Sequence, residues 1–154
     1  MLAPFTKVVV DREEEAKFRR RALQRKPHEY IESLLGYVRR DTLYIAMFVP
    51  MEHDGKLTKV NYDDDELDEH DEDAKEVHLE LLGTIHTHYE SGDATLSEHD
   101  IRDIQETQEA VVAILNIEMR NKDGNPLRRC KTEIAYWPAL RPFTIDRRSF
   151  KKNS

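Results

Sequence analysis

Short apolar runs separated by polar turns dominate this sequence and predict a fold rich in β-strands. Each run is rich in β-branched, aromatic or leucine side chains and has the length of a strand. Six runs meet this description: residues 7–10, 31–39, 42–50, 77–85, 110–119 and 131–137. Turn-forming residues stand between the second and third runs (Arg40-Asp41) and between the last two (residues 121–126, NKDGNP), which predicts two antiparallel pairs.

Two helices are expected between these strands. Asp11 can cap a helix with three glutamates in its first turn and arginines further along, an order of charge that suits the helix dipole. Pro27 ends this helix. Ser97 can cap a second helix after the fourth run. The combination predicts the α/β class, with one domain over residues 1–154 and a mixed central sheet flanked by helices.

Two segments depart from the pattern. Residues 54–76 are polar and acidic without apolar periodicity, and we expect an acidic loop insertion with at most a short helix. Residues 138–154 are basic and are expected to form a peripheral tail. Residues 63–76 alone carry ten carboxylates and one lysine, a net charge of −9. The net charge of the whole chain is −7, so the residues outside this segment carry −7 − (−9) = +2. The acidity is therefore confined to this segment.

The local acidity restricts the partners of this segment. Like charges repel, so nucleic acid is not expected to bind this segment. We expect the segment either to face a basic protein surface or to lie in solvent. The segment also lacks the glycine and the regular oxygen spacing of a calcium loop, which favours a solvated loop over a calcium site.

Composition narrows the class of protein further. With 154 residues and 38% hydrophobic residues, the chain can bury one core. No apolar stretch approaches the roughly 20 residues of a membrane helix, and the first residues lack a signal-peptide pattern. The single cysteine, Cys130, can form neither an internal disulfide nor a cysteine-based zinc cluster. We therefore expect a cytoplasmic protein without a membrane partner.

Two histidines and an aspartate form the strongest candidate site. His86 and His88 are two apart, so on an extended backbone they face the same side. Asp100 lies twelve residues beyond His88, in the first turn of the helix expected after Ser97. Two histidines and one carboxylate, with a fourth position open to water, are typical of a catalytic zinc site. The alternative is that the site holds no metal. His86 and His88 would then be ordinary histidines, Asp100 would only interact with the helix dipole, and Ser97 would only cap the helix.

The wider motif resembles that of the JAMM (MPN-plus) zinc metallopeptidases. Residues 82–88 (LGTIHTH) resemble the family's strand leading into H-[ST]-H, and residues 97–100 (SEHD) resemble its S-x-x-D. Residues 91–97 (SGDATLS) are similar to the S-G-D-P-T-P-S loop of bacterial members. Eight residues rather than seven separate His88 from the serine, and Tyr89 replaces the usual proline. The resemblance implies one zinc ion per chain, held by the two histidines and the aspartate.

The family also has a glutamate seven residues before a glycine, in the pattern E-x-x-G-x-x-x-G. Counting back from Gly36 gives Glu29. Glu32 occupies the position where the first glycine is usual and is the rival candidate. The resemblance implies that one of these glutamates, Glu29 by preference, transfers protons. It implies that the hydroxyl of Ser97 stabilises the oxyanion.

The implied activity is hydrolysis of an isopeptide or peptide bond at the C-terminus of ubiquitin or a ubiquitin-like protein. The alternatives are a deconjugating or processing peptidase of a bacterial antiphage or sulfur-carrier system, and a non-catalytic MPN scaffold that binds proteins. Zinc nucleoside deaminases share a loosely similar architecture but need P-C-x-x-C, which one cysteine excludes. Family members often pair, so a homodimer is compatible with the resemblance.

Overall fold

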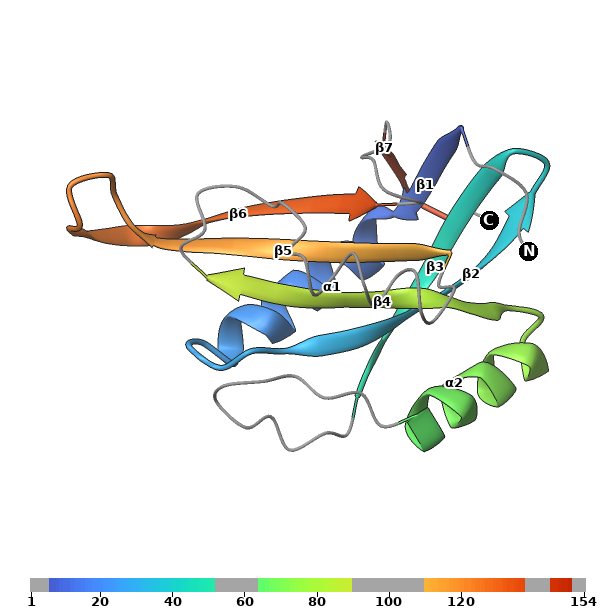
Figure 1. Cartoon of the computed structure of the whole chain (residues 1–154). Helices are drawn as coiled ribbons and strands as arrows, with labels where there is room; N and C mark the ends of the chain where they lie inside the picture. Colours follow the sequence, from blue (N-terminus) through green and yellow to red (C-terminus); the bar gives the residue numbers. More distant parts are fainter. Residues whose placement is uncertain (1–5, 52–63, 90–109, 138–144, 151–154) are drawn as a thin grey trace.

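The computed structural model describes residues 6–51, 64–89, 110–137 and 145–150, and these form a seven-stranded mixed sheet with two helices (Figure 1). The α/β class with a mixed central sheet is thereby confirmed. The helices are α1 (Arg12–Gln24) and α2 (Asp64–Glu76). The strands are β1 (Lys7–Asp11), β2 (Ile31–Arg39), β3 (Thr42–Pro50), β4 (Glu80–Tyr89), β5 (Val111–Arg120), β6 (Pro126–Trp137) and β7 (Ile145–Arg148).

The strand order is β6-β5-β4-β2-β3-β1-β7. The pairs β2–β3 and β5–β6 are antiparallel, which confirms the two predicted hairpins. Strand β4 lies inside the sheet, antiparallel to β2 on one side and parallel to β5 on the other. The strand that carries both candidate histidines is therefore held by a neighbour on each side.

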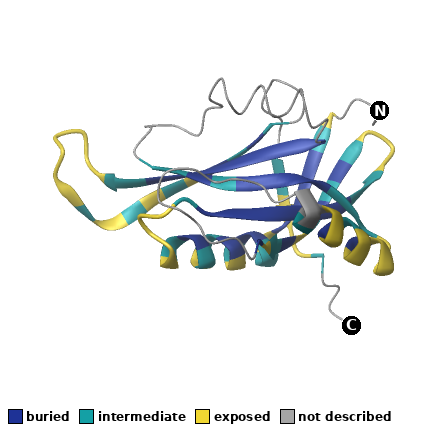
Figure 2. Ribbon diagram, turned by 60° about the horizontal axis from the view of Figure 1, so that its bottom comes forward, coloured by how far each residue is buried: buried dark blue, intermediate teal, exposed yellow. Residues whose placement is uncertain are grey.

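Helix α1 covers one face of the sheet. Asp11 accepts a hydrogen bond from the backbone N–H of Glu13 at 3.0 Å, which confirms the predicted cap. Phe18 is fully buried, with its ring stacked near those of Tyr30 and Phe48 at centroid distances of 6.1 and 5.4 Å. Burying such a side chain contributes about 1.5–3 kcal/mol. Figure 2 shows the buried central strands, with the outer turns of the helices exposed.

Helix α2 lies on the opposite face. The carboxylate of Glu32 accepts a hydrogen bond from Arg21 of α1. The next residue, Ser33, has its Oγ 2.7 Å from Nδ1 of His70 of α2. Successive side chains of a strand point to opposite faces, so the two helices sandwich the sheet. Neither described helix is long and apolar enough to cross a membrane.

The expectation that residues 54–76 are mainly loop is wrong for residues 64–76, which form α2. Among the residues of α2 whose side chains the structure describes, His70 and Ala74, one turn apart, are buried against the sheet. The side chain of Asp71 also accepts a hydrogen bond from the N–H of Leu81 at 3.2 Å. Because the anchoring side chains are polar or small, the helix shows no apolar period in the sequence.

Strand β4 is displaced from its predicted bounds of 77–85. Residues 77–79 form a turn after α2, in which His78 has a φ of 63° and the N–H of Leu79 bonds to the carbonyl of Ala74 at 2.8 Å. At its other end the strand continues through Tyr89, paired with Ile117 of β5. Both histidines therefore lie on the regular strand.

Within the basic tail, residues 145–148 form β7, an edge strand parallel to β1. Arg147 of this strand pairs with the buried carboxylate of Glu15 at 2.8 Å. The hydroxyl of Tyr136 donates to the same carboxylate at 2.6 Å. A basic residue of the tail thus completes a partly buried network that joins α1, β6 and β7.

Candidate metal centre

His86 and His88 lie side by side near the end of β4, on one face of the sheet. Their Nε2 atoms are 3.1 Å apart, and their rings meet at an interplanar angle of 63°. Two rings in this position can share a proton or flank a cation. Two nitrogens bound to a tetrahedral zinc ion at 2.0–2.1 Å are about 3.4 Å apart. The observed separation is about 0.3 Å shorter than this, so the pair is close to the spacing of two ligands of one zinc ion.

Glu29 is brought to the same face by the register of β2 and β4. Ile31 pairs with His86, and the N–H of Thr87 bonds to the carbonyl of Tyr30 at 3.0 Å. The hydroxyl of Thr87 accepts from the N–H of Tyr30 at 2.9 Å. Strand β2 begins at Ile31, and continuing its register by two residues puts Glu29 level with His88, on the face that carries the histidines. Glu29 is half-buried there.

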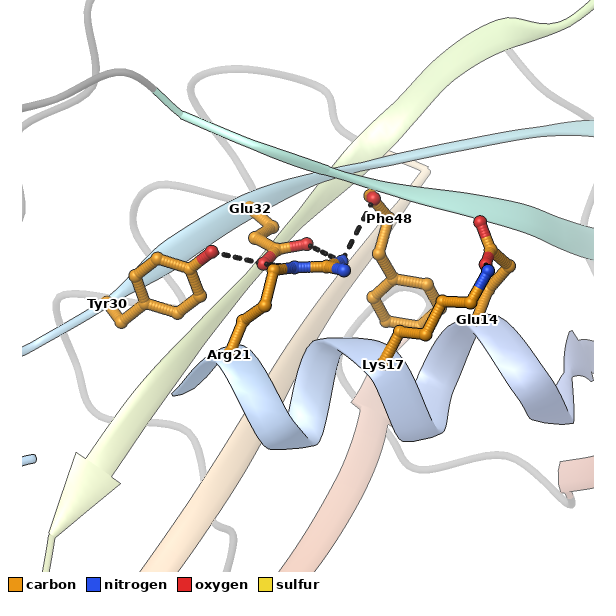
Figure 3. Close-up of polar contacts among 6 residues, drawn as sticks. All are labelled: Glu14, Lys17, Arg21, Tyr30, Glu32 and Phe48. Carbon is orange, nitrogen blue, oxygen red and sulfur yellow. Dashed lines mark hydrogen bonds and ion pairs between the residues drawn. The ribbon is translucent and has the colours of Figure 1, made fainter. Parts of the chain in front are cut away.

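Glu32 lies on the opposite face, under α1, and is fully buried (Figure 3). Its carboxylate accepts two hydrogen bonds from the guanidinium of Arg21, at 2.7 and 2.8 Å, and a third from the hydroxyl of Tyr30. The hydrogen bond to Glu32 raises the pKa of the Arg21 guanidinium above its usual value. Burial, and then the bond to Glu32, raises the pKa of Tyr30. Glu32 is therefore the centre of an ion pair, directed away from the histidines.

Tyr89, the residue in place of the family's proline, fixes the chain that leads to Glu29. Its hydroxyl donates to the backbone carbonyl of His28 at 2.7 Å. Burial raises the pKa of Tyr89, so the hydroxyl keeps the proton that it donates. The hydroxyl binds to the residue directly before Glu29, a contact that the sequence could not reveal.

Asn116 is a further polar residue of this face that sequence reasoning missed. It pairs with His88 across β4 and β5 and is only 2% exposed. The available signal was a single amide in the otherwise apolar run AVVAILNI. A buried amide in register with a histidine can supply a hydrogen bond beside the imidazole.

Ser97 and Asp100 lie outside the described residues, so the structure neither joins them to the histidines nor separates them. Within the described part of the chain, no group of three or more His, Cys, Asp or Glu residues could hold a metal ion. The described site consists of the two histidines of β4 and Glu29, which lies two residues before β2, and Asn116 of β5 is in register with His88.

Comparisons with known proteins agree with this fold. Residues 11–130 match the family model described as prokaryotic homologs of the JAB domain. The structure is similar to a solution structure of a protein from Desulfitobacterium hafniense (TM-score 0.62, 15% identity, covering 92% of this chain and 93% of that chain). It is also similar to the crystal structure of a JAB1/MPN domain protein from Archaeoglobus fulgidus (TM-score 0.53, 14% identity, covering 94% and 99%). A comparison with curated protein sequences finds no match.

Proposed function

Because the chain belongs to the family of prokaryotic homologs of the JAB domain, we propose that it is a zinc-dependent peptidase. Its proposed reaction is hydrolysis of an isopeptide or peptide bond at the C-terminus of ubiquitin or a ubiquitin-like protein. The observation that carries the proposal is the 3.1 Å separation of the His86 and His88 nitrogens, on the face where the register puts Glu29.

The proposed metal ligands are His86, His88 and Asp100, with one zinc ion per chain. The spacing of the two imidazole nitrogens supports this donor set, and neutral imidazole with carboxylate is a usual combination for catalytic zinc. Zinc bound there would acidify a water molecule and polarise the carbonyl of the scissile bond.

The protein's own residues would move the protons. By extension of the β2–β4 register Glu29 falls level with His88, and its carboxylate is proposed to accept a proton from water and return it to the leaving amine. The hydroxyl of Ser97 is proposed to donate a hydrogen bond to the developing oxyanion, a contribution typically of about 2.7–4 kcal/mol. Glu32 has no such role in this proposal, because its carboxylate is bonded to Arg21 and Tyr30 on the other face.

Metal content tests the proposal. We expect the purified protein to bind one zinc ion per chain and His88→Ala to bind none, because two remaining ligands hold zinc poorly. The measurement is elemental analysis after dialysis, with circular dichroism to verify folding. His28→Ala is the matched control, since that side chain is exposed and only its backbone bonds to Tyr89. A folded wild-type protein that binds no zinc would instead support the non-catalytic scaffold.

Loss of the Tyr89 hydroxyl is expected to slow hydrolysis. Tyr89→Phe removes the bond to the His28 carbonyl while keeping the ring. Displacing Glu29 by even 1 Å can lower the rate by about 10²-fold, so we expect a fall of about tenfold or more in kcat with zinc content unchanged. The rate is measured with ubiquitin joined through its C-terminus to the lysine of a fluorescent peptide.

A double variant separates positioning from general damage to the fold. If Tyr89 acts through Glu29, then adding Tyr89→Phe to Glu29→Gln should cause little further loss of rate. An equal loss in both backgrounds would mean that the hydroxyl does not act through the glutamate.

A further inference from the structure

A basic β-hairpin projects from the end of the sheet that lies away from α2 (Figure 1 and Figure 2). Strands β5 and β6 form it, and they meet at the turn of residues 121–125. Residues 120–131, the basic hairpin, carry five cationic side chains and one carboxylate, a net charge of +4. All five cations are exposed: Arg120, Lys122, Arg128, Arg129 and Lys131. The chain therefore has a strongly basic surface as well as an acidic one.

Hydrogen bonds within the turn hold the tip of the hairpin in one conformation. The side chain of Asn121 accepts bonds from the N–H groups of Asp123 and Asn125, both at 2.9 Å. Gly124 has a φ of 83°, which residues with a side chain rarely adopt. The guanidinium of Arg120 donates to the carbonyl of Gly124 at 3.0 Å. A tip fixed in this way loses little conformational freedom on binding, which favours affinity.

Positive charge lies on both faces of the hairpin. The ammonium of Lys26, just after α1, donates to Sγ of Cys130 on β6 at 3.1 Å. Lys131 follows Cys130 and is paired with Glu118 of β5. Successive residues of a strand point to opposite faces, so Lys131 lies on the face away from Lys26. A partner that surrounds the hairpin therefore meets cations on either side.

The acidic helix is too distant to cancel this charge. Asp71 of α2 contacts the N–H of Leu81 near the start of β4. Seven residues further along β4, His88 is level with Asn116 of the parallel strand β5. Arg120 lies another four residues along β5, about 36 Å from Leu81 along the sheet at 3.3 Å per residue. Exposed charges are largely screened beyond about 8 Å at physiological ionic strength, so the repulsion of nucleic acid by α2 does not extend to the basic hairpin.

The side chains of the hairpin favour a duplex polyanion over a protein. Protein interfaces are centred on buried aromatic or aliphatic side chains. Leu127 is the single large apolar residue of the basic hairpin and is half-buried, and the exposed large hydrophobic residues of the described chain, Met47 and Val77, lie elsewhere. The hairpin also has no aromatic side chain on which the bases of a single strand could stack. Its chemistry therefore suits the phosphates of a double helix.

The shape of the hairpin selects DNA among the double helices. The major groove of B-form DNA is about 12 Å wide and admits a two-stranded β-ribbon. The major groove of A-form RNA is too deep and narrow for side chains to read. A ribbon with cations on both faces can contact the phosphates on both sides of the wider groove.

We propose that the basic hairpin binds duplex DNA through its phosphates, with the ribbon in the major groove and without preference for sequence. Four residues of β5 separate Asn116, which is level with His88, from Arg120, about 13 Å along the strand. The bound DNA therefore lies beside the candidate metal centre, and it holds the protein close to other DNA-bound proteins. This binding does not depend on the proposed peptidase activity.

Fluorescence anisotropy of a labelled DNA duplex of about 20 base pairs tests the proposal, with the purified full chain as titrant. We expect a Kd of about 10⁻⁴ to 10⁻⁶ M at physiological salt, as for other non-specific DNA binding. If all five cations contact phosphates, the logarithm of the association constant falls against the logarithm of the salt concentration with a slope of about −4.5.

Arg128→Ser/Arg129→Ser is expected to weaken binding about tenfold or more at about 50 mM NaCl and to make the slope shallower by about 1.8, because two phosphate contacts are lost. Arg128→Lys/Arg129→Lys keeps both charges and should retain most of the affinity. Circular dichroism verifies folding. If the serine variant does not fold, Lys122→Ser in the turn makes the same test, with a change of about 0.9 in the slope.

Arg39→Ser/Arg40→Ser is the matched control. These two arginines are also adjacent and exposed, but they lie at the turn between β2 and β3, at the other end of the sheet (Figure 1). We expect the control variant to bind within about twofold of the wild type. Equal losses in the two serine variants would mean that only net charge matters, and no anisotropy change at about 50 mM NaCl would mean that the hairpin does not bind DNA. Either result overturns the proposal.

Three other probes identify the partner. If single-stranded DNA of the same length or an RNA duplex binds as tightly as the DNA duplex, the ribbon does not occupy the major groove and the proposal fails. If a polyglutamate peptide of similar charge binds as tightly, the hairpin takes an acidic protein instead. A protein that binds the DNA duplex but hydrolyses no conjugate would refute the proposed function and leave this proposal intact.

Discussion

Glu29→Gln is expected to lower kcat by about 10²–10⁴-fold, the usual contribution of a general acid–base group. Glutamine keeps the size of the side chain but cannot accept the proton. Zinc content should stay at one per chain, because Glu29 is not among the proposed ligands. The rate is measured on the ubiquitin–peptide conjugate, with zinc determined on the same samples.

Glu133→Gln is the matched control for this loss. Glu133 is exposed on β6, so the same change of charge should leave the rate within about twofold, as surface substitutions usually have small effects. An unchanged rate in Glu29→Gln would remove Glu29 from the mechanism. A loss of zinc would instead make it a ligand.

Glu32→Gln is expected to destabilise the fold rather than to act on the reaction. Removing one partner of a buried ion pair costs about 3–5 kcal/mol, and we expect about 3 kcal/mol because Arg21 keeps 33% exposure. The substitution removes the negative charge that accepts two bonds from Arg21 and one from Tyr30. Urea unfolding measures the loss, as a lower midpoint at an unchanged slope.

Replacing both charged partners distinguishes an unpaired charge from a general packing defect. Arg21→Met/Glu32→Leu should be more stable than Glu32→Gln, because no buried charge is left without its counterpart. If the double variant is the less stable of the two, the cost lies in packing. A Glu32→Gln protein as stable as the wild type would mean that the ion pair contributes nothing.

The sequence predicted those parts of the fold in which local and tertiary preferences agree. Strands β2 and β3 have the predicted bounds, because continuous apolar runs meet at a polar turn. Helix α2 was missed because His70 and Ala74 anchor it without an apolar stripe. Strand β7 was missed because Arg147, a residue typical of a surface, is paired with a carboxylate far away in the sequence.

The candidate site was predictable only as far as spacing along a strand allows. Two histidines two residues apart must share a face, and the structure agrees. The choice between Glu29 and Glu32 could not be made from spacing. A separation of three residues on a strand puts the two side chains on opposite faces, but it does not say which face carries the histidines. The pairing of Ile31 with His86, together with the position of Arg21 on α1, supplies that missing information.

The position of β7 has a consequence for how the chain is made. Strand β1 lies between β3 and β7, so its outer edge stays unpaired until residues 145–148 have been synthesised. At 5–20 residues per second, the ribosome needs roughly 7 to 27 s to travel from the end of β1 to β7. During that interval Val8, Val9 and Val10 offer an open strand edge to neighbouring nascent chains. The ribosome-bound protein therefore carries an open edge at β1 until β7 pairs with it.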